Sequence, residues 1–198
     1  MISKAPVELT DIDLPGGNAA VYAVHSPAFG AVFMQVRRDD DAQNPRAVVI
    51  ADAQRLVQAW RAAAGAWGQG HANRWLDQAR HLLGQGPALG RDRWLAYLSA
   101  AAWARDSRSL ASGRAFGAGP VQPVPAATMG LAHGGGLHVI SGVGQILWLL
   151  AGGARAFPIE CHAAHARHVA AAVGIPNSYA VSVESITRCG QVMAIQAR

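Results

Sequence analysis

Residues 137–174 alternate between short apolar runs and glycine-containing turns, and this pattern constrains the fold more than any other feature of the sequence. The spacing predicts two strands and two helices in alternation: Leu137–Ile140, Val143–Leu150, Ala156–Cys161 and Ala163–Val173. Ser141 and Gly142 form the first turn, and Gly174 is placed as a glycine that ends the last helix. We therefore expect a fold that mixes strands with helices.

The N-terminal part of the chain, residues 1–50, is predicted to be β-structure. Two apolar runs, Ala19–Val24 and Ala31–Arg37, are separated by turn residues, which indicates a β-hairpin. Ala47–Ile50 is predicted to be a buried strand. Asp52 then caps a helix whose apolar face, in the residues that follow, is formed by Leu56, Val57 and Trp60.

The remaining segments complete a single domain of residues 1–198, in three parts: strands in 1–50, a helical section in 51–106 and a core in 120–198. Apolar spacing predicts further helices near Ala72–Leu83 and Arg91–Arg105. Residues 107–136 are expected to form a long loop, apart from an extended Pro123–Pro125. Final strands are predicted at Tyr179–Val183 and Gln191–Ile195.

Composition excludes several classes of protein. Hydrophobic residues make up 51% of the chain and charged residues 15%, which is not the composition of a disordered tail. No apolar stretch reaches the about 20 residues of a membrane span, and the first residues lack the apolar core of a signal peptide. Two cysteines, Cys161 and Cys189, do not make a disulfide framework. We expect a soluble cytoplasmic protein.

The positive charge is concentrated in the middle of the chain. The net charge is +5, and the 17 basic residues are arginines except for Lys4. Five of the six tryptophans lie among the arginines of residues 42–115. Arginine and tryptophan are frequent at the energetic centres of protein interfaces, which indicates a docking surface for a protein partner. The predicted partner-binding residues are Trp67, Arg80, Arg91 and Arg93. Weak, non-specific contact with nucleic acid is the alternative use of such a surface.

Metal and nucleophile patterns are incomplete. The acidic run Asp39–Asp41 has no neighbouring residues that complete a cation site and is interpreted as a solvated loop. His162, His165 and His168 are three residues apart, but no carboxylate or cysteine completes a tetrahedral set, so a solvated helix face is expected. Cys161 and Ser141 lack activating neighbours in the sequence. We expect no metal, no cofactor and no catalytic residue.

The strand–turn–helix–strand unit resembles the signature unit of the ParB/sulfiredoxin-like fold. It resembles plasmid fertility inhibition factors more closely, through Pro123–Pro125, Trp148–Ala151 and the strand entry Gly153–Pro158. The resemblance covers residues 120–175 and implies an α+β fold. That fold is a ParB/sulfiredoxin-like mixed sheet with an N-terminal β-hairpin and a helical middle section.

The resemblance also points to a ligand site at the turn, formed by Ser141, Gly142, Gly144 and Gln145. Phosphate-handling members of the superfamily carry arginine and histidine there, whereas this chain has Val143, Gly144 and Gln145. The guanidinium groups that clamp a phosphate and the imidazole that moves a proton are therefore missing. A turn kept for packing is the favoured interpretation, a retained ligand site is the alternative, and an enzyme is disfavoured.

By resemblance, the protein is a plasmid-encoded factor that blocks conjugative transfer of a co-resident plasmid. The implied partner is the coupling protein of another plasmid's type IV secretion system, a hexameric ATPase. The alternative is a ParB/sulfiredoxin-like ATPase and DNase that acts on transferred DNA.

Overall fold

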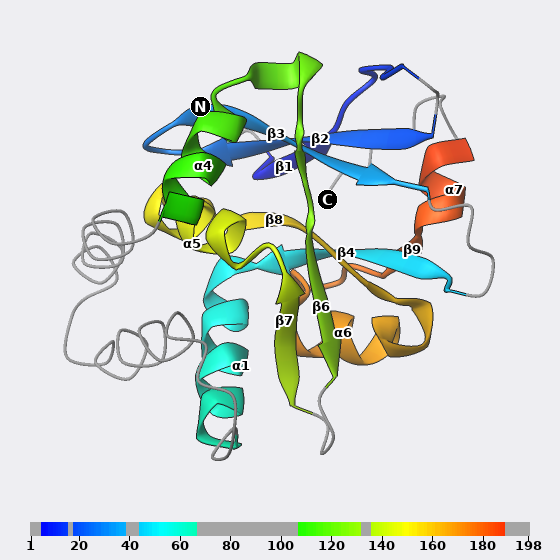
Figure 1. Ribbon diagram of the computed structural model, residues 1–198. Coiled ribbons are helices and arrows are strands. Elements are labelled where there is room, and N and C mark those ends of the chain that lie inside the picture. The colour runs from blue at the N-terminus through cyan, green and yellow to red at the C-terminus, as the bar shows by residue number, and fades with distance from the viewer. Residues whose placement is uncertain (1–4, 16–17, 39–43, 67–106, 132–135, 189–198) are drawn as a thin grey trace.

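The N-terminal apolar runs fold into a β-hairpin, as the sequence predicts. The computed structural model in Figure 1 describes residues 5–15, 18–38, 44–66, 107–131 and 136–188. Strand β2 (Ala19–Ser26) pairs antiparallel with β3 (Gly30–Arg37) over their full lengths. Gly30 closes the turn with a φ of +74°, a left-handed conformation that glycine adopts without a steric penalty.

This hairpin is the centre of a four-stranded sheet in the order β1-β2-β3-β5. Strand β1 (Val7–Leu9) pairs antiparallel with β2, and β5 (Val124–Pro125) pairs parallel with β3. Alternate residues of β3, namely Val32, Met34 and Val36, are buried. The sheet therefore turns one apolar face toward the core, as the period of two in the sequence requires.

A second sheet of five strands has the order β7-β6-β8-β4-β9 and lies below the first in Figure 1. Its strands are β4 (Arg46–Asp52), β6 (Ala127–Leu131), β7 (Leu137–Ser141), β8 (Ala156–His162) and β9 (Val181–Ser182). Only the β6–β8 pair is parallel. The predicted strands in this part of the chain, at Ala47–Ile50, Leu137–Ile140 and Ala156–Cys161, are confirmed.

One extended segment, Val124–Leu131, carries the chain from the first sheet into the second (Figure 1). It begins as β5 and continues as β6, so the predicted extended conformation of Pro123–Pro125 is confirmed. The predicted long loop over 107–136 is wrong. Residues 107–116 form helix α4 (Ser107–Phe116), and a 3-10 turn, Gly119–Val121, precedes β5. The glycines and prolines of this region are typical of loops, but the short elements here are stabilised by packing on the sheets rather than by local propensity.

Helices α1 (Ala53–Ala66) and α6 (Ala166–Val173) cover β4 on the side away from the first sheet (Figure 1). Asp52 caps α1 as predicted, because its Oδ1 accepts a hydrogen bond of 2.9 Å from the Arg55 backbone. The Arg55 guanidinium donates to the carbonyl of Gly174 at 2.6 Å and also to that of Ala171. One helix thus caps the end of the other.

Helix α6 ends before Gly174, as predicted, but for a different reason. The residue is not left-handed, since its φ is −63°. A Cβ at Gly174 would lie 2.6 Å from the carbonyl oxygen of Ala170. Close approach of the backbone therefore selects glycine here.

The C-terminal part of the described chain is more helical than predicted. Only Val181 and Ser182 of the predicted strand Tyr179–Val183 pair with β4, because Ser182 caps helix α7 (Val183–Arg188) through a 3.0 Å bond from the Ser185 backbone. The predicted strand Gln191–Ile195 and the helical segments between 67 and 106 lie outside the described residues. Among those that are described, no helix is long and apolar enough to span a membrane.

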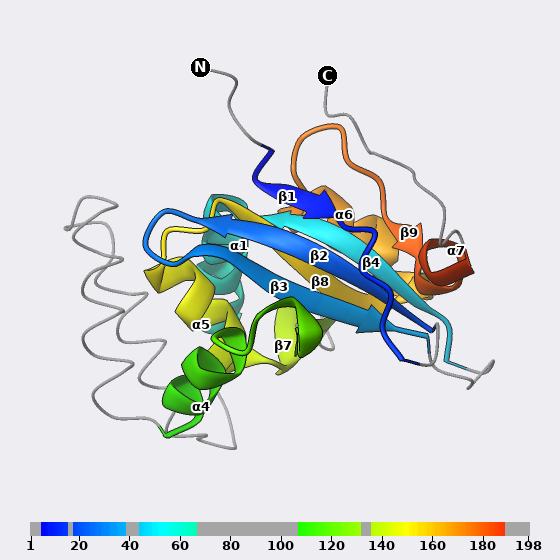
Figure 2. The ribbon, with the colours of Figure 1, turned by 90° about the horizontal axis from the view of Figure 1, so that it is seen from above.

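Both sheets and the helices contribute to one apolar core. Its largest fully buried side chains include Phe157 and Ile159 of β8, Met34 of β3, Leu56 of α1 and Leu149 of α5 (Val143–Ala151). Seen from above in Figure 2, β2 and β3 lie across β4 and β8, and α4 and α5 close one end of the stack. The observed α+β architecture with two mixed sheets and an N-terminal hairpin agrees with the predicted fold class.

Candidate functional site

The turn between β7 and α5 holds the four residues predicted to form a ligand site. Ser141 is exposed, and Gly142, Gly144 and Gln145 are partly buried at the beginning of the helix. The structure brings these residues together, as their adjacency in the sequence requires. The question is what fixes the shape of the turn.

Position 142 must adopt a positive φ and lie close to Ala127, and only glycine satisfies both conditions. Gly142 precedes α5 with a φ of +83°, in the left-handed region, and its carbonyl accepts the first helical hydrogen bond, 3.0 Å long, from Ile146. A Cβ at Gly142 would lie 2.6 Å from the Cβ of Ala127 and 2.7 Å from its Cα. The glycine therefore lets β6 pack directly against the turn, and this contact needs no ligand.

Residues 141–145 themselves supply only polar groups without charge. The first backbone N–H groups of α5 point out of the helix and favour an anion weakly. The Gln145 carboxamide oxygen lies 3.4 Å from the position that a Cβ on Gly142 would occupy, so this side chain folds back over the turn. Residues 141–145 contain no basic side chain that could hold a phosphate. The arrangement supports the interpretation as a packing turn.

A feature that the sequence did not reveal lies at the other end of α5. The Trp148 ring is stacked between Phe29, at a centroid distance of 4.0 Å, and Phe116, at 4.5 Å. Phe29 comes from the tip of the N-terminal hairpin and Phe116 from the end of α4. The sequence shows the motif Trp148–Ala151, but nothing local to it identifies two ring partners that both lie more than thirty residues earlier in the chain.

Hydrogen bonds attach the same hairpin tip to the end of α5. The buried Ser26 hydroxyl donates to the Gly152 carbonyl at 2.6 Å, and the Ala28 backbone donates to the same oxygen at 3.1 Å. A Cβ at Gly152 would lie 2.5 Å from both the Phe29 ring and the Ser26 hydroxyl oxygen. The pair Gly152-Gly153 therefore ends the helix and also leaves room for the hairpin tip.

The structure does not gather the histidines at 162, 165 and 168 into one set of ligands. The His162 and His165 ring centroids are 5.6 Å apart, but the Nδ1 of His162 accepts a hydrogen bond of 3.1 Å from the Ala164 backbone. An accepting Nδ1 places the ring proton on Nε2, so neither nitrogen offers a free lone pair to a metal ion. His168 is exposed on α6, and no group of three candidate ligands occurs in the described parts of the chain.

Cys161 is not placed for redox or nucleophilic chemistry. The side chain is fully buried in β8, and burial, with a smaller contribution from the charge of Glu160, raises the pKa of the thiol to about 11. At neutral pH the sulfur is therefore protonated and unreactive. The same two causes raise the pKa of the buried Tyr22 hydroxyl far above its ordinary value.

The predicted partner-binding residues, Trp67, Arg80, Arg91 and Arg93, lie outside the described residues, and so does the acidic run Asp39–Asp41. The docking surface inferred from them stays a prediction. So does the assignment of the fold to the ParB/sulfiredoxin-like group.

Comparisons with known proteins test the fold. No protein-family model matches the sequence, and no curated protein sequence is significantly similar to it. The structure is similar to the crystal structure of the Oncogenic Suppression Activity Protein, a plasmid fertility inhibition factor solved as a gold(I) cyanide derivative. The TM-score is 0.63 at 19% sequence identity, and the match covers 96% of this chain and 88% of the other. The predicted resemblance is therefore confirmed at the level of the fold, which this chain shares with a plasmid fertility inhibition factor.

Proposed function

We propose that this protein is a plasmid-encoded fertility inhibition factor that blocks conjugative transfer of a co-resident plasmid. The observation that carries the proposal is the shared fold, which extends over 96% of the chain rather than over one motif. The sequence resemblance adds support, because its motifs Pro123–Pro125 and Trp148–Ala151 contribute Val124 and Trp148 to the same buried core. A fold alone does not define a function, so the proposal needs a direct test.

The proposed mechanism is occlusion of the coupling protein of the other plasmid's type IV secretion system. A basic surface of this protein, containing Trp67, Arg80, Arg91 and Arg93, docks on the cytoplasmic ATPase domain and prevents its substrate from engaging. The net charge of +5 supports a partner surface that is acidic, since complementary charge speeds association and fixes orientation.

The enzymatic alternative, an ATPase or DNase that acts on transferred DNA, has less support. Such a site would need groups that hold a phosphate, yet residues 141–145 supply only backbone N–H groups and uncharged side chains. The packing of Gly142 on Ala127 accounts for the shape of the turn without a ligand. No feature of the described structure favours this alternative.

A mating assay combined with co-purification tests the proposal. Donor cells that carry a second conjugative plasmid should transfer that plasmid much less often when they express this protein. The coupling protein of the second plasmid should co-purify with this protein. We expect Trp67→Ala with Arg91→Ala to lose both effects. Arg167→Ala, which removes an exposed arginine of α6, is the matched control and should retain both.

Two results would contradict the proposal in different ways. Unchanged transfer with the wild-type protein, against a panel of conjugative plasmids, would remove fertility inhibition itself. Full inhibition without binding of any coupling protein would leave the role but remove occlusion as its mechanism.

A further inference from the structure

The two adjacent strands β4 and β8 are buried on both faces over most of their length, so burial by itself does not fix how their residues pair. Ala47, Val48, Val49 and Ala51 of β4 are buried, as are all residues of β8 from Ala156 to Cys161. A half-buried strand fixes its register because a shift of one residue moves its apolar side chains into water. Strands that are apolar on both faces lack that constraint. Something else must select the observed pairing of Val49 with Ile159.

Glu160 interrupts this apolar surface. Its side chain is 5% exposed, and the Arg46 Nη1 lies 2.5 Å from its Oε2. Across the β4–β8 ladder, Glu160 is paired with Val48 and Arg46 is paired with His162. The two charged residues are therefore diagonal neighbours on one face of the sheet, a separation that a long side chain spans.

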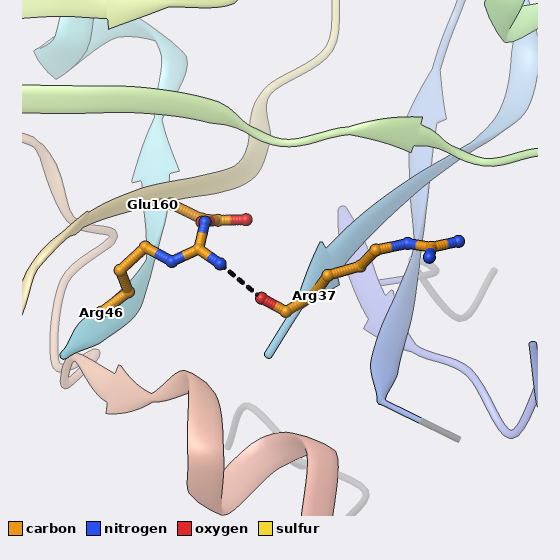
Figure 3. Close-up of polar contacts among 3 residues, drawn as sticks. All are labelled: Arg37, Arg46 and Glu160. Carbon is orange, nitrogen blue, oxygen red and sulfur yellow. Dashed lines mark hydrogen bonds and ion pairs between the residues drawn. The ribbon is translucent and has the colours of Figure 1, made fainter. Parts of the chain in front are cut away.

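The same guanidinium reaches the other sheet. Figure 3 shows the Nη2 of Arg46 donating to the backbone carbonyl of Arg37, at 2.7 Å. Arg37 is the last residue of β3, so one planar group joins β4, β8 and the four-stranded sheet. Arginine suits this position because its donors form a rigid fork that can serve two acceptors at once.

We infer that the Arg46–Glu160 pair fixes the register of β4 against β8 and holds the four-stranded sheet against both strands. A slip of one residue would turn Arg46 to the opposite face of the sheet. A slip of two would move it about 7 Å along the strand. A slip of one residue, or a slip of two that pairs Arg46 with Ala164, separates the buried Glu160 carboxylate from Arg46, and burial of a carboxylate that has lost its partner is strongly unfavourable. A slip of two in the other direction would pair Arg46 directly with Glu160, but it would carry the guanidinium away from the Arg37 carbonyl of the four-stranded sheet. The pair thus penalises the alternatives that apolar packing tolerates.

The test replaces the pair by apolar residues of similar volume, Arg46→Met with Glu160→Leu. Such replacements often leave stability unchanged or raise it, so we expect the denaturant midpoint to be at least that of the wild type. Register should nevertheless be lost. We expect several sets of cross-strand nuclear Overhauser contacts between β4 and β8, and about tenfold faster amide exchange at Val48 and Val49.

A single set of contacts with exchange rates of the wild type would overturn the inference. It would show that apolar packing, together with Pro158 in the centre of β8, is sufficient, because Pro158 is present in every variant. Arg37→Ala is the matched control. It removes a neighbouring exposed guanidinium but leaves the Arg37 carbonyl in place, and it should behave like the wild type.

Two single variants keep the test decisive if the double variant does not fold. Glu160→Gln retains a carbonyl acceptor for Arg46, whereas Glu160→Leu does not. We expect one register, with the Val49–Ile159 contact, in the first and several registers in the second. Identical behaviour of the two variants would also overturn the inference.

Discussion

The two ends of helix α5 differ in the way their sequences relate to their structures. The N-terminal end, at Ser141–Gln145, has the pattern of a ligand-binding turn, but its polar groups are uncharged and its glycine is selected by the packing of Ala127. The C-terminal end has no pattern typical of a site. There Trp148 is stacked between two aromatic rings, and the hairpin tip is hydrogen-bonded to Gly152.

The comparison shows that close packing accounts for a glycine at each end of α5. At both ends of α5 a glycine makes room for another chain segment, β6 at Gly142 and the hairpin tip at Gly152. The motif is therefore a marker of how α5 packs against elements of both sheets at one end of the stack. It is a weaker marker of what the protein binds.

The largest expected effect is at the C-terminal end, in Trp148→Ala. The substitution removes the central ring of the stack, whose exposed fraction is 5%, and should lower the free energy of unfolding by about 3–5 kcal/mol. Chemical denaturation followed by far-ultraviolet circular dichroism measures it. Trp148→Phe, which keeps a stacked ring, should lose about half as much. Equal stability of Trp148→Ala and the wild type would show that the stack does not contribute to stability.

The next effect is at the N-terminal end, in Gly142→Ala. The new Cβ meets the Ala127 backbone, and an alanine at a φ of +83° is strained, so a loss of about 2–4 kcal/mol is expected. Thermal unfolding measures it. If the variant is as stable as the wild type, packing on Ala127 does not explain the glycine at this end of α5.

Gly152→Ala should also destabilise the protein, by about 1–3 kcal/mol, because its Cβ meets the Phe29 ring, at an exposed hairpin tip, and the hydroxyl oxygen of the buried Ser26. We expect Phe29→Ala to relieve part of this loss in a double-mutant cycle. Additive losses in the two single variants would contradict direct contact between these positions.

The smallest expected effect is that of Ser141→Ala combined with Gln145→Ala. Both side chains lie at the surface of the turn, so stability should change by within about 0.5 kcal/mol. Transfer inhibition in the mating assay should also be unchanged if the turn serves packing. A variant of full stability that no longer inhibits transfer would instead favour a ligand site at this end of the helix.

Much of the local structure could be predicted. The two strands of the N-terminal hairpin, the Asp52 cap and the sequence of strand, turn, helix and strand after residue 137 depend on neighbours within a few residues, and these predictions are confirmed. The long loop expected over 107–136 was wrong because α4 and β6 are too short to be recognised without the sheets that stabilise them. The four residues of the turn were identified as a group, but the packing that shapes it was not.

The sequence by itself determined the hairpin, the Asp52 cap of α1, the end of α6 at Gly174 and the absence of basic side chains from the turn, because each depends on residue type and local spacing. Only the tertiary structure decided the stack at Trp148 and the pairing of Arg46 with Glu160, two residues 114 positions apart. Such contacts arise when two sheets and a helix bury a common core. Their partners are chosen by proximity in space, which no local pattern records.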